Sequence, residues 1–365
     1  MPTDHPLASL LRPELSQLQA YLPHPAPPGT VRLDANESPF ELPPERKRAL
    51  VARAAEGVAL NRYPDAGCTA LREAVAARAG CDPEAVVLGN GTDEVIAMIL
   101  GALSRPRAGH EKASVLFPWP SFVMYRVSAL ALGVDPVAVP LDAAWDLDLE
   151  AFREAAATRR PNVLFLPSPN NPTGNRFSDD RVEALVRAHP DALVVLDEAY
   201  GPFAGAGYDA LRRAHPHVAQ LQTLSKVGFA ALRCGWAILP RDIATEVNKV
   251  RQPYNLDALT QAIAREVLTT EWAWIEETVA TVRAERVRLV NALRTGAGLR
   301  VTPSHANFVW LRVPDAARTH AALLARGVLV RSFHAQGGRM AQQLRITVGT
   351  PAENDALLSA LPFCR

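Results

Sequence analysis

Lys226 follows an apolar run and precedes a turn that contains glycine, in the sequence Thr223-Leu224-Ser225-Lys226. A lysine amine forms a Schiff base with an aldehyde when its surroundings are dry enough to keep part of it neutral. Most lysines are instead solvated surface residues, because lysine is almost never fully buried. The position of Lys226 behind an expected buried strand, with Arg233 shortly after it, favours the chemical interpretation.

A carboxylate ends another apolar run: Asp197 follows Leu193–Leu196, and Tyr200 comes three residues later. A carboxylate beside a pyridine nitrogen keeps the ring protonated and makes it a stronger electron sink. The resulting ion pair holds the carboxylate ionised, while the tyrosine hydroxyl can donate to a phenolic oxygen on the same ring. An aspartate at a strand end is also a common helix cap. Its occurrence 29 residues before Lys226 (226 − 197) favours a shared cofactor site.

The turn Ser168–Gly174 reads Ser-Pro-Asn-Asn-Pro-Thr-Gly and follows a third apolar run. Two prolines and a glycine fix a tight turn, so the Asn171 amide can be held rigidly. It can then reach the phenolic oxygen from the side opposite Tyr200. Asn-Pro and Thr-Gly also occur in plain turns. The position of Asn171, 26 residues before Asp197 (197 − 171), strengthens the functional interpretation.

A glycine-containing turn, Gly89–Glu94, joins an apolar run to a helical pattern. Glycines allow the backbone to approach a ligand, and free N–H groups at a helix start suit a phosphate. We expect the backbone at Gly91 and Thr92 to bind a phosphate, with Ser225 and Arg233 completing the cup, since arginine makes bidentate contacts to phosphate. The segment matches neither common nucleotide-binding glycine motif, and such turns are often structural.

Between residues 45 and 245, apolar runs alternate with amphipathic helical patterns. This alternation predicts a mostly parallel sheet, which would position these segments. Ligands bind beyond the carboxyl ends of such strands, so we expect the polar strand exits to converge on one crevice. Phe122 can stack there on a cofactor ring, although a phenylalanine at a strand end is more often core. The expected strands are Val86–Leu88, Ser114–Phe117, Val134–Val139, Val163–Leu166, Leu193–Leu196 and Leu221–Leu224.

The expected fold class is α/β, with a large α/β/α sandwich and a smaller α/β domain. We expect an N-terminal arm over residues 1–44, which packs on the small domain and on a dimer partner. Residues 45–255 form the large cofactor-binding domain, and residues 256–365 form a long connecting helix and the small domain. The remaining expected elements are an irregular proline-rich arm after a short helix in 1–30, helices Asp93–Leu103 and Asp179–Ala188, an N-cap at Ser178, a nearly unbroken helical pattern over 256–295, and strands Asn307–Arg312, Val328–Arg331 and Leu344–Val348.

The bulk composition excludes several classes of protein. The net charge of +1 gives no overall field that favours nucleic acid or an anionic membrane. No apolar stretch approaches the ~20 residues that span a bilayer, and the N-terminus lacks the pattern of a secretory signal. The four scattered cysteines, Cys68, Cys81, Cys234 and Cys364, are typical of reduced thiols. We therefore expect a cytoplasmic protein without a metal site.

Taken together, these segments resemble the fold-type I aminotransferases, and among them the histidinol-phosphate aminotransferases. The resemblance extends from about Leu33 to Leu361. Its further markers are Leu33–Glu37 (Leu-Asp-Ala-Asn-Glu), Arg62–Asp65 (Arg-Tyr-Pro-Asp), Asp197–Tyr200 (Asp-Glu-Ala-Tyr) and Leu344–Thr350 (Leu-Arg-Ile-Thr-Val-Gly-Thr).

The resemblance implies a pyridoxal 5'-phosphate (PLP) cofactor held as a Schiff base on Lys226. It implies that Asp197 pairs with the pyridine nitrogen, Asn171 and Tyr200 hold the phenolic oxygen, and Phe122 stacks on the ring. The phosphate contacts are those expected above from Gly91, Thr92, Ser225 and Arg233. Tyr63 of the Arg-Tyr-Pro motif reaches the neighbouring subunit's cofactor, which makes a homodimer the catalytic unit.

For the substrates, Arg345 is expected to bind the carboxylate of glutamate or the phosphate of a phosphorylated amino alcohol, with help from Arg331, because a guanidinium matches either anion. Arg331 can equally be a solvated strand-end residue. Asn307 is expected to support the part of the site formed by these arginines, and Asn36 is expected to close over the substrate. The implied reaction exchanges an amino group between L-histidinol phosphate and 2-oxoglutarate in histidine biosynthesis.

The chain departs from the family pattern at two points. Lys226 and Arg233 are seven steps apart (233 − 226), one fewer than in the usual pattern, which puts the geometry of the phosphate contact in question. The stacking position holds phenylalanine instead of tyrosine. Alternative functions are an aromatic amino-acid aminotransferase, a phosphothreonine decarboxylase on the same scaffold, or a non-catalytic regulator. The combination of Lys226, Asp197 and Arg233 argues against the regulator.

Overall fold

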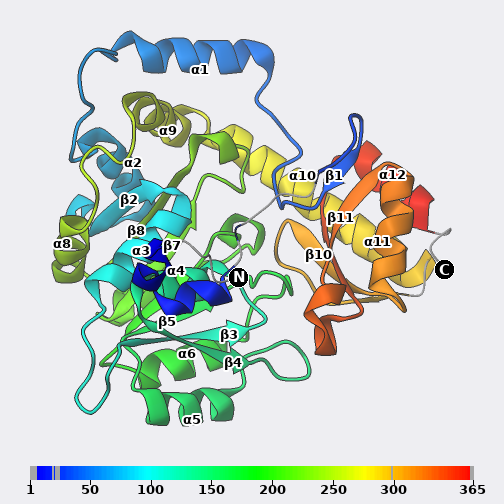
Figure 1. Ribbon diagram of the computed structural model, residues 1–365. Helices are drawn as coiled ribbons and strands as arrows, with labels where there is room; N and C mark the ends of the chain where they lie inside the picture. The colour runs from blue at the N-terminus through cyan, green and yellow to red at the C-terminus, as the bar shows by residue number, and fades with distance from the viewer. Residues whose placement is uncertain (1–5, 19, 21–24, 297–298, 362–365) are drawn as a thin grey trace.

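The computed structural model describes residues 6–18, 20, 25–296 and 299–361 of the chain. Two β-sheets, each with its own helices, make up two bodies. Figure 1 shows the larger body on the left and the smaller on the right, with α10 (Trp272–Asn291) running from one to the other. This arrangement agrees with the predicted α/β fold class of a large sandwich and a smaller α/β unit. The predicted boundaries at residues 44 and 255 remain a proposal.

The larger sheet has the strand order β2-β8-β7-β6-β5-β3-β4. Its strands are parallel except for β8, which is antiparallel to both of its neighbours. The central strands are buried throughout, as expected of a sheet covered on both faces. The strands are β2 (Val86–Asn90), β3 (Ser114–Trp119), β4 (Asp135–Pro140), β5 (Val163–Pro167), β6 (Leu193–Asp197), β7 (Val218–Thr223) and β8 (Cys234–Ile238).

Helices cover both faces of this sheet. One face packs against α3, α4 and α8 through side chains such as Ile96, Tyr125 and Val247. The other face packs against α5 and α6, for example through Phe152 and Val186, and against α2 and α9. The large body is therefore an α/β/α sandwich. Its helices are α1 (Pro44–Glu56), α2 (Thr69–Ala79), α3 (Gly91–Ala102), α4 (Met124–Leu132), α5 (Leu149–Arg159), α6 (Asp179–Ala188), α7 (Asp209–Ala214), α8 (Arg241–Lys249) and α9 (Ala258–Thr270).

The smaller sheet has the order β1-β11-β12-β10-β9, and its first strand comes from the N-terminal segment. Because β1 pairs in parallel with β11, the residues that follow β1 start from the small sheet and lead to α1 in the large body. The elements are β1 (Val31–Leu33), β9 (Arg300–Val301), β10 (Phe308–Arg312), α11 (Ala316–Ala325), β11 (Val328–Ser332), β12 (Gln343–Thr347) and α12 (Pro351–Ala360).

Several expectations about elements need correction or refinement. The helical pattern over 256–295 is divided: α9 ends at Thr270, α10 begins at Trp272, and a π-helical turn covers Ala292–Gly296. The buried carboxylate of Glu271 lies at the break and receives hydrogen bonds from Arg46 and Arg53. Ser178 occupies the predicted N-cap position of α6, but its hydroxyl donates to Asp146 at 2.5 Å and makes no capping hydrogen bond. Strand β7 begins three residues earlier than predicted, and β8 was not predicted.

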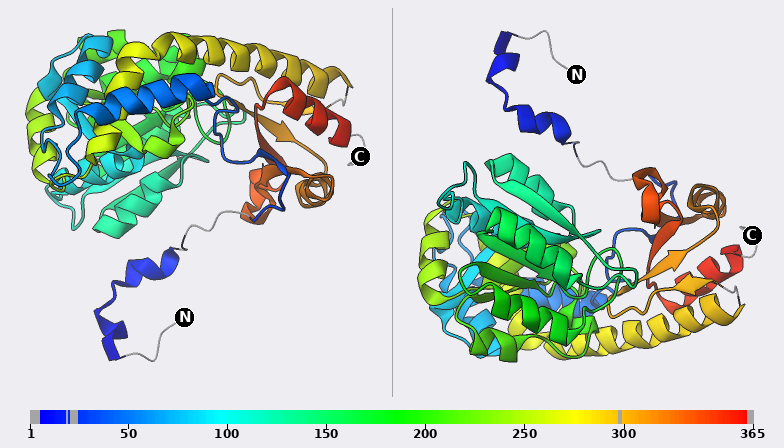
Figure 2. Two further views of the ribbon diagram at one scale, coloured as in Figure 1. Left: turned by 90° about the horizontal axis from the view of Figure 1, so that it is seen from above. Right: turned by 90° about the horizontal axis from the view of Figure 1, so that it is seen from below.

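The N-terminal segment contains two 3₁₀ turns, η1 (Pro6–Leu10) and η2 (Pro13–Gln17), in place of the predicted short helix. Figure 2 shows them projecting from the two bodies. Arg12 connects them to the large body by donating to the backbone carbonyls of Leu130 and Ala131 at the end of α4.

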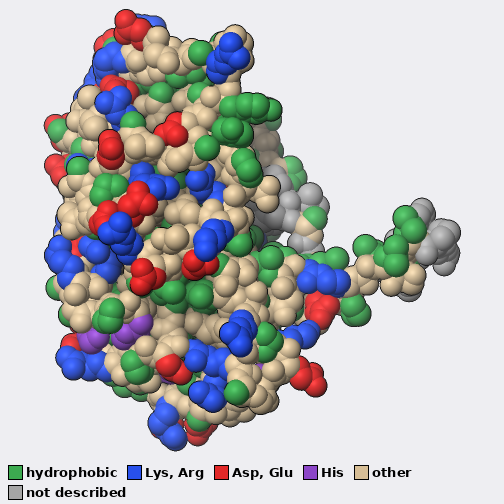
Figure 3. Space-filling view, turned by 90° about the vertical axis from the view of Figure 1, so that its left-hand side faces the viewer, with side chains coloured by type: hydrophobic (Ala, Val, Ile, Leu, Met, Phe, Trp, Pro, Cys, Tyr) green, Lys and Arg blue, Asp and Glu red, His purple; other side chains and the backbone are tan. Residues whose placement is uncertain are grey.

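Basic and acidic side chains are interspersed on the face drawn in Figure 3, in keeping with the small net charge. Within the described ranges, no helix has both the length and the apolar character needed to cross a membrane. Cys68, Cys81 and Cys234 are free thiols, and Cys364 lies outside the described residues.

Candidate active site at the carboxyl edge of the large sheet

Five parallel strands of the large sheet, β2, β3, β5, β6 and β7, end at the same edge, because β8 is the only strand of this sheet that runs the opposite way. Each is followed by residues that the sequence predicts to act chemically. These are Gly91 and Thr92 after β2, Phe122 after β3, Asn171 after β5, Asp197 and Tyr200 at and after β6, and Ser225 and Lys226 after β7.

Asp197 is the last residue of β6 and is 5% exposed. Its Oδ2 accepts a hydrogen bond from the Tyr125 hydroxyl at 2.6 Å, and its Oδ1 accepts from the backbone N–H of Ala199 at 3.0 Å. Burial raises the pKa of Asp197 to about 6, although both hydrogen bonds and the charge of Lys226 lower it. The carboxylate therefore occupies a dry position where a nearby cation would stabilise its ionised form.

Tyr125 was not predicted as a site residue. It lies in the first turn of α4, three residues after Phe122, and is fully buried. Its ring stacks on Phe165 of β5 at 4.6 Å between centroids and meets the edge of Phe122 at 5.7 Å. These contacts fix the hydroxyl that holds Asp197. Sequence reasoning would class such a residue as core, since an aromatic residue near a helix start has no special spacing.

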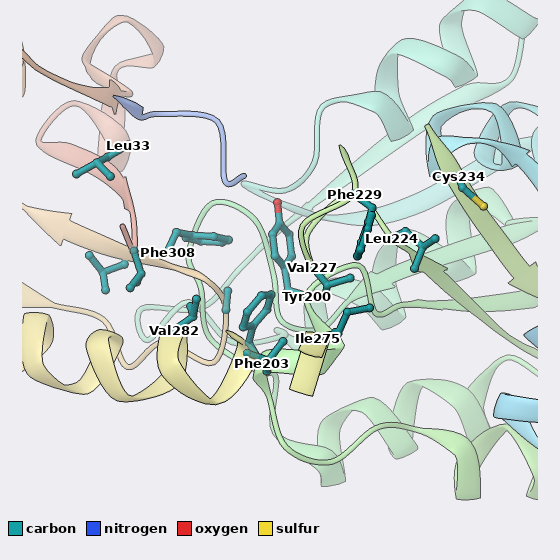
Figure 4. Packing of buried hydrophobic residues seen from close by; sticks show 14 of the residues in the cluster. Leu33, Tyr200, Phe203, Leu224, Val227, Phe229, Cys234, Ile275, Val282 and Phe308 are labelled. Atoms are coloured by element: carbon teal, nitrogen blue, oxygen red, sulfur yellow. The ribbon is translucent and has the colours of Figure 1, made fainter. Parts of the chain in front are cut away.

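Lys226 is half-buried after β7, with its Nζ 5.8 Å from the centroid of the Tyr200 ring. Tyr200 is buried, and Phe308 meets its ring edge-on at 5.0 Å. Figure 4 shows the Tyr200 ring close to Phe203, Val227 and Phe308, with its hydroxyl pointing away from them. The lysine amine and the tyrosine ring are therefore neighbours at the carboxyl edge of the sheet.

Close contacts surround Gly91 at the start of α3. Arg233 precedes β8, which neighbours β2, and its carbonyl accepts the Gly91 N–H at 2.5 Å. Gly91 has φ +73°, and a Cβ there would lie 2.6 Å from the Arg233 guanidinium. A Cβ at Gly235 would lie 2.6 Å from the backbone nitrogen of Thr92. These two positions therefore require glycine.

The shortened segment between Lys226 and Arg233 still brings the arginine to the end of β2. Its guanidinium lies 3.2 Å from the Asp93 carboxylate and 3.4 Å from the Asn90 carbonyl. Ser225 is buried nearby: its N–H donates to the Thr223 hydroxyl oxygen, and the two side-chain oxygens are 2.9 Å apart. A half-exposed guanidinium, two hydroxyls and the start of α3 are suitable donors for a phosphate.

Asn171 and Arg345 form a contact between the two bodies. Arg345 donates to Asn171 Oδ1 at 2.7 Å and to the Asp34 carbonyl at 2.6 Å. Because the Asn171 oxygen accepts, its amide nitrogen is available as a donor to a ligand. Arg331 lies directly opposite Arg345 in the β11–β12 ladder, so the two guanidinium groups share one face of the small sheet.

Two predicted residues have surroundings that the sequence did not indicate. Asn36 is 1% exposed and donates to the Tyr200 hydroxyl at 3.0 Å, so it is held against Tyr200 instead of standing open to a ligand. Asn307 donates to the Asn36 carbonyl, in agreement with a bracing role. Tyr63 is 81% exposed and stacks on Tyr254 at 4.5 Å. Its predicted contact with a partner's cofactor remains a prediction.

The residues of this edge fit pyridoxal phosphate as a group. The buried Asp197 has hydrogen-bond donors but no cation in contact within the described residues, and a protonated pyridine would supply one. The glycines at positions 91 and 235 leave room for no side chain beside Arg233 and Thr92, where the phosphate donors gather. Between these two ends, Lys226 follows β7, which lies between β8 and β6 in the sheet.

Comparison with known proteins agrees with this geometry. The family model for class I and II aminotransferases matches residues 28–361. The chain is 42% identical over 360 residues to histidinol-phosphate aminotransferase of Paracidovorax citrulli, with 96% of each protein covered. It is 43% identical over 353 residues to the enzyme of that name from Chromobacterium violaceum, with 96% of this chain and 97% of the relative covered.

Solved structures share the fold of this chain. Histidinol-phosphate aminotransferase from Sinorhizobium meliloti, in complex with pyridoxal 5'-phosphate, has a TM-score of 0.81 at 25% identity, covering 98% of this chain and 97% of that one. L-threonine-O-3-phosphate decarboxylase from Porphyromonas gingivalis has a TM-score of 0.74 at 23% identity, covering 91% and 98%. The second likeness shows the shared fold alone.

Proposed function

We propose a specific reaction for this chain, which belongs to the class I and II family of pyridoxal-phosphate-dependent aminotransferases. It exchanges an amino group between L-histidinol phosphate and 2-oxoglutarate, as a step of histidine biosynthesis. The observation that carries the cofactor assignment is the buried carboxylate of Asp197 at the edge where Lys226 emerges. The substrate assignment is supported by the named relatives and by two arginines opposite each other on the small sheet.

Different residues of the site would bind different parts of the cofactor. Asp197 would face the pyridine nitrogen, Phe122 would stack on the ring, and Asn171 and Tyr200 would donate to the phenolic oxygen. Gly91, Thr92, Ser225 and Arg233 would bind the phosphate, and Lys226 would hold the aldehyde carbon covalently. When bound, the cofactor supplies an electron sink for the carbanion that forms at the substrate Cα.

Lys226 also moves the proton. With the cofactor bound, the Lys226 Nζ would act as the general base that takes the proton from the substrate Cα. Its half-buried position next to the Tyr200 ring keeps the amine within the crevice. Asp197 stays ionised beside a protonated pyridine, because the ion pair offsets the effect of burial on its pKa.

Arg345 and Arg331 bind the anionic end of either substrate. Arg345 already donates to Asn171 and to the backbone at Asp34, which fixes its guanidinium next to the cofactor residues. A planar guanidinium suits both the carboxylate of glutamate and the phosphate of histidinol phosphate. Asn36, predicted to close over the substrate, contributes to the site indirectly, through its hydrogen bond to the Tyr200 hydroxyl.

The catalytic unit is a homodimer in which Tyr63 enters the partner's crevice. The support is the exposure of Tyr63, whose ring stacks on Tyr254 at the surface of its own subunit. Tyr254 has a positive φ of 59°, so the pair is presented by a constrained backbone. A cytoplasmic location is supported by the free thiols of Cys68, Cys81 and Cys234.

Replacement of Lys226 tests the cofactor assignment most directly. We expect the purified protein to be yellow and borohydride to fix the cofactor to a peptide containing residue 226. Lys226→Ala should abolish that adduct and reduce turnover to background. Lys249→Ala, which removes an exposed lysine of α8, is the matched control and should behave as the parent protein. An adduct that persists on another lysine in the Lys226→Ala protein would reject the assignment.

Product analysis tests the substrate. With L-histidinol phosphate and 2-oxoglutarate, we expect glutamate to form at a higher kcat/KM than with phenylalanine or tyrosine as donor. An aromatic preference would identify an aromatic aminotransferase. Release of carbon dioxide from threonine phosphate without amino transfer would identify a decarboxylase.

A further inference from the structure

Asn36 connects the small body to an active-site tyrosine of the large body. It follows β1 of the small sheet, is almost fully buried, and has a positive φ of 57°, which asparagine tolerates better than most residues. Its backbone N–H donates to Thr347 Oγ1 at 3.0 Å, and its carbonyl accepts from Asn307 Nδ2 at 3.0 Å. Both partners belong to the small body, one on β12 and one just before β10.

The hydrogen bonds of Asn36 determine which way its amide points. Thr347 Oγ1 accepts the Asn36 N–H, so the threonine proton is available for Asn36 Oδ1, which lies 3.3 Å away. The other end of the amide is then the NH₂ group, which donates to the Tyr200 hydroxyl oxygen at 3.0 Å. An amide NH₂ cannot accept a hydrogen bond. The Tyr200 oxygen is therefore the acceptor here, and its own proton must point elsewhere.

We propose that Asn36 is a positioning residue that directs the hydroxyl proton of Tyr200 toward the phenolic oxygen of the cofactor. This inference rests on the proposed role of Tyr200 in the cofactor site. The Tyr200 ring is held by Phe308 and lies beneath Lys226 Nζ, so its hydroxyl has little freedom except rotation about the C–O bond. Occupying one lone pair of the oxygen with the Asn36 donor fixes that rotation.

Both ends of the Asn36–Tyr200 contact are braced by one buried arginine. Arg286 of α10 donates to the carbonyl of Phe203, three residues after Tyr200, at 3.2 Å. It also donates to the carbonyl of Ala306, the neighbour of Asn307, at 2.8 Å. The contacts that link Tyr200, Arg286, Asn307 and Asn36 therefore form one closed ring. A shift of the small body relative to the large one would change the direction of the Tyr200 proton.

The test uses the visible absorbance of the protein loaded with pyridoxal phosphate, followed against pH without substrate. A donor to the phenolic oxygen stabilises its anionic form and lowers the pH at which the absorbance changes. We expect Tyr200→Phe to raise this midpoint by about 1 to 2 units, the effect of one hydrogen bond to a charged group. Asn36→Gly, which suits the positive φ, should raise it by a smaller amount, about half a unit.

The double variant separates direct from indirect action. If Asn36 acts through Tyr200, adding Asn36→Gly to Tyr200→Phe leaves the midpoint where Tyr200→Phe alone puts it. Glu37→Gly, an exposed neighbour in the same segment, is the matched control and should leave the midpoint unchanged. Asn36→Asp keeps the size and the turn preference but replaces the donor by an acceptor, so it should raise the midpoint at least as far as Asn36→Gly.

An unchanged midpoint in both Asn36 variants overturns the inference. So does an Asn36→Gly shift that is equally large in the parent protein and in the Tyr200→Phe protein. If Tyr200→Phe itself leaves the midpoint unchanged, the proposed contact of Tyr200 with the cofactor fails together with the inference. Failure of the broader function is seen separately, as a colourless protein without an adduct at Lys226.

Discussion

The two ends of the proposed cofactor site differ in how the protein surrounds them. At the pyridine end, Asp197 is 5% exposed, and both of its oxygens accept hydrogen bonds from groups fixed in the core. At the phosphate end, the Arg233 side chain is 50% exposed, and its ion-pair partner Asp93 is 39% exposed. The first end is dry and pre-organised, and the second is open to water.

The difference shows which interactions carry which part of the function. A buried carboxylate is electrostatically costly, so a change at Asp197 should alter the chemistry strongly. An exposed ion pair contributes little, since water and salt screen it. At the open end the backbone shape at Gly91 and Gly235 matters more than any single charge.

The largest effect is expected at Asp197. Asp197→Asn keeps the shape and the contact with Tyr125 but removes the charge that is proposed to hold the pyridine protonated. Loss of one pre-organised electrostatic interaction at a reacting centre costs ~10²–10³-fold in kcat, measured as steady-state turnover with saturating cofactor. Asp180→Asn, an exposed position in the first turn of α6, should have no effect. If the turnover of Asp197→Asn were within a few-fold of the parent protein, the distinction between the two ends would be wrong.

The stability of the cofactor-free protein should depend on pH because of the buried end. Burial raises the pKa of Asp197 from 3.8 to about 6 and that of the neighbouring Glu198 from 4.5 to about 7. Such groups bind more protons in the folded than in the unfolded chain. The free energy of unfolding therefore falls as pH rises from about 4 to about 7.

Denaturant unfolding of the cofactor-free protein at several pH values measures this dependence. Each group contributes on the order of 2 to 3 kcal/mol to the fall, so Asp197→Asn and Glu198→Gln should each flatten the curve. Added cofactor should flatten it as well if a cation pairs with Asp197. A curve that rises over this window in the parent protein would contradict the assigned burial.

At the open end, Gly91→Ala should weaken cofactor binding. The positive φ of 73° and the 2.6 Å approach to the Arg233 guanidinium both oppose a Cβ, and a left-handed conformation costs alanine ~1–2 kcal/mol. We expect the Kd for pyridoxal phosphate to rise about tenfold, measured by fluorescence titration of the cofactor-free protein. Gly101→Ala in the same helix has open space around its Cβ and should bind normally. Equal affinities would show that Arg233 can move aside freely.

The sequence predicts the strand exits well, because each apolar run ends where a polar residue appears. The positions of Asp197 and Lys226 at or just after strand ends were predicted in this way, and strands β5 and β6 match the predicted ranges within one residue. Strand β8 (Cys234–Ile238) was missed because it is antiparallel, while the surrounding pattern indicates parallel units. The break at Glu271 depends on two arginines of α1, which are more than 200 residues away.

The side-chain contacts within the site could not be predicted. Tyr125 is distinguished from other core aromatics only by the carboxylate it meets in three dimensions. The role of Asn36 depends on β1 joining the small sheet, which places the following residues over Tyr200. Sequence spacing contains no signal for either contact, because the partners lie 72 and 164 positions away.

The smallest effect is expected from Asp93, which competes with the phosphate for Arg233. Asp93→Asn removes the ion pair at 3.2 Å and should tighten binding of pyridoxal phosphate by no more than about fivefold, because exposed pairs contribute ~0.2–1 kcal/mol. The gain should shrink at high salt, since screening already weakens the pair in the parent protein. Titrations of the cofactor-free protein at low and high ionic strength measure both effects. Asp242→Asn on α8 changes the net charge equally at an exposed position and controls for it. A large, salt-independent loss of affinity would mean that Asp93 positions Arg233 for the phosphate, and the open end would then be pre-organised like the buried one.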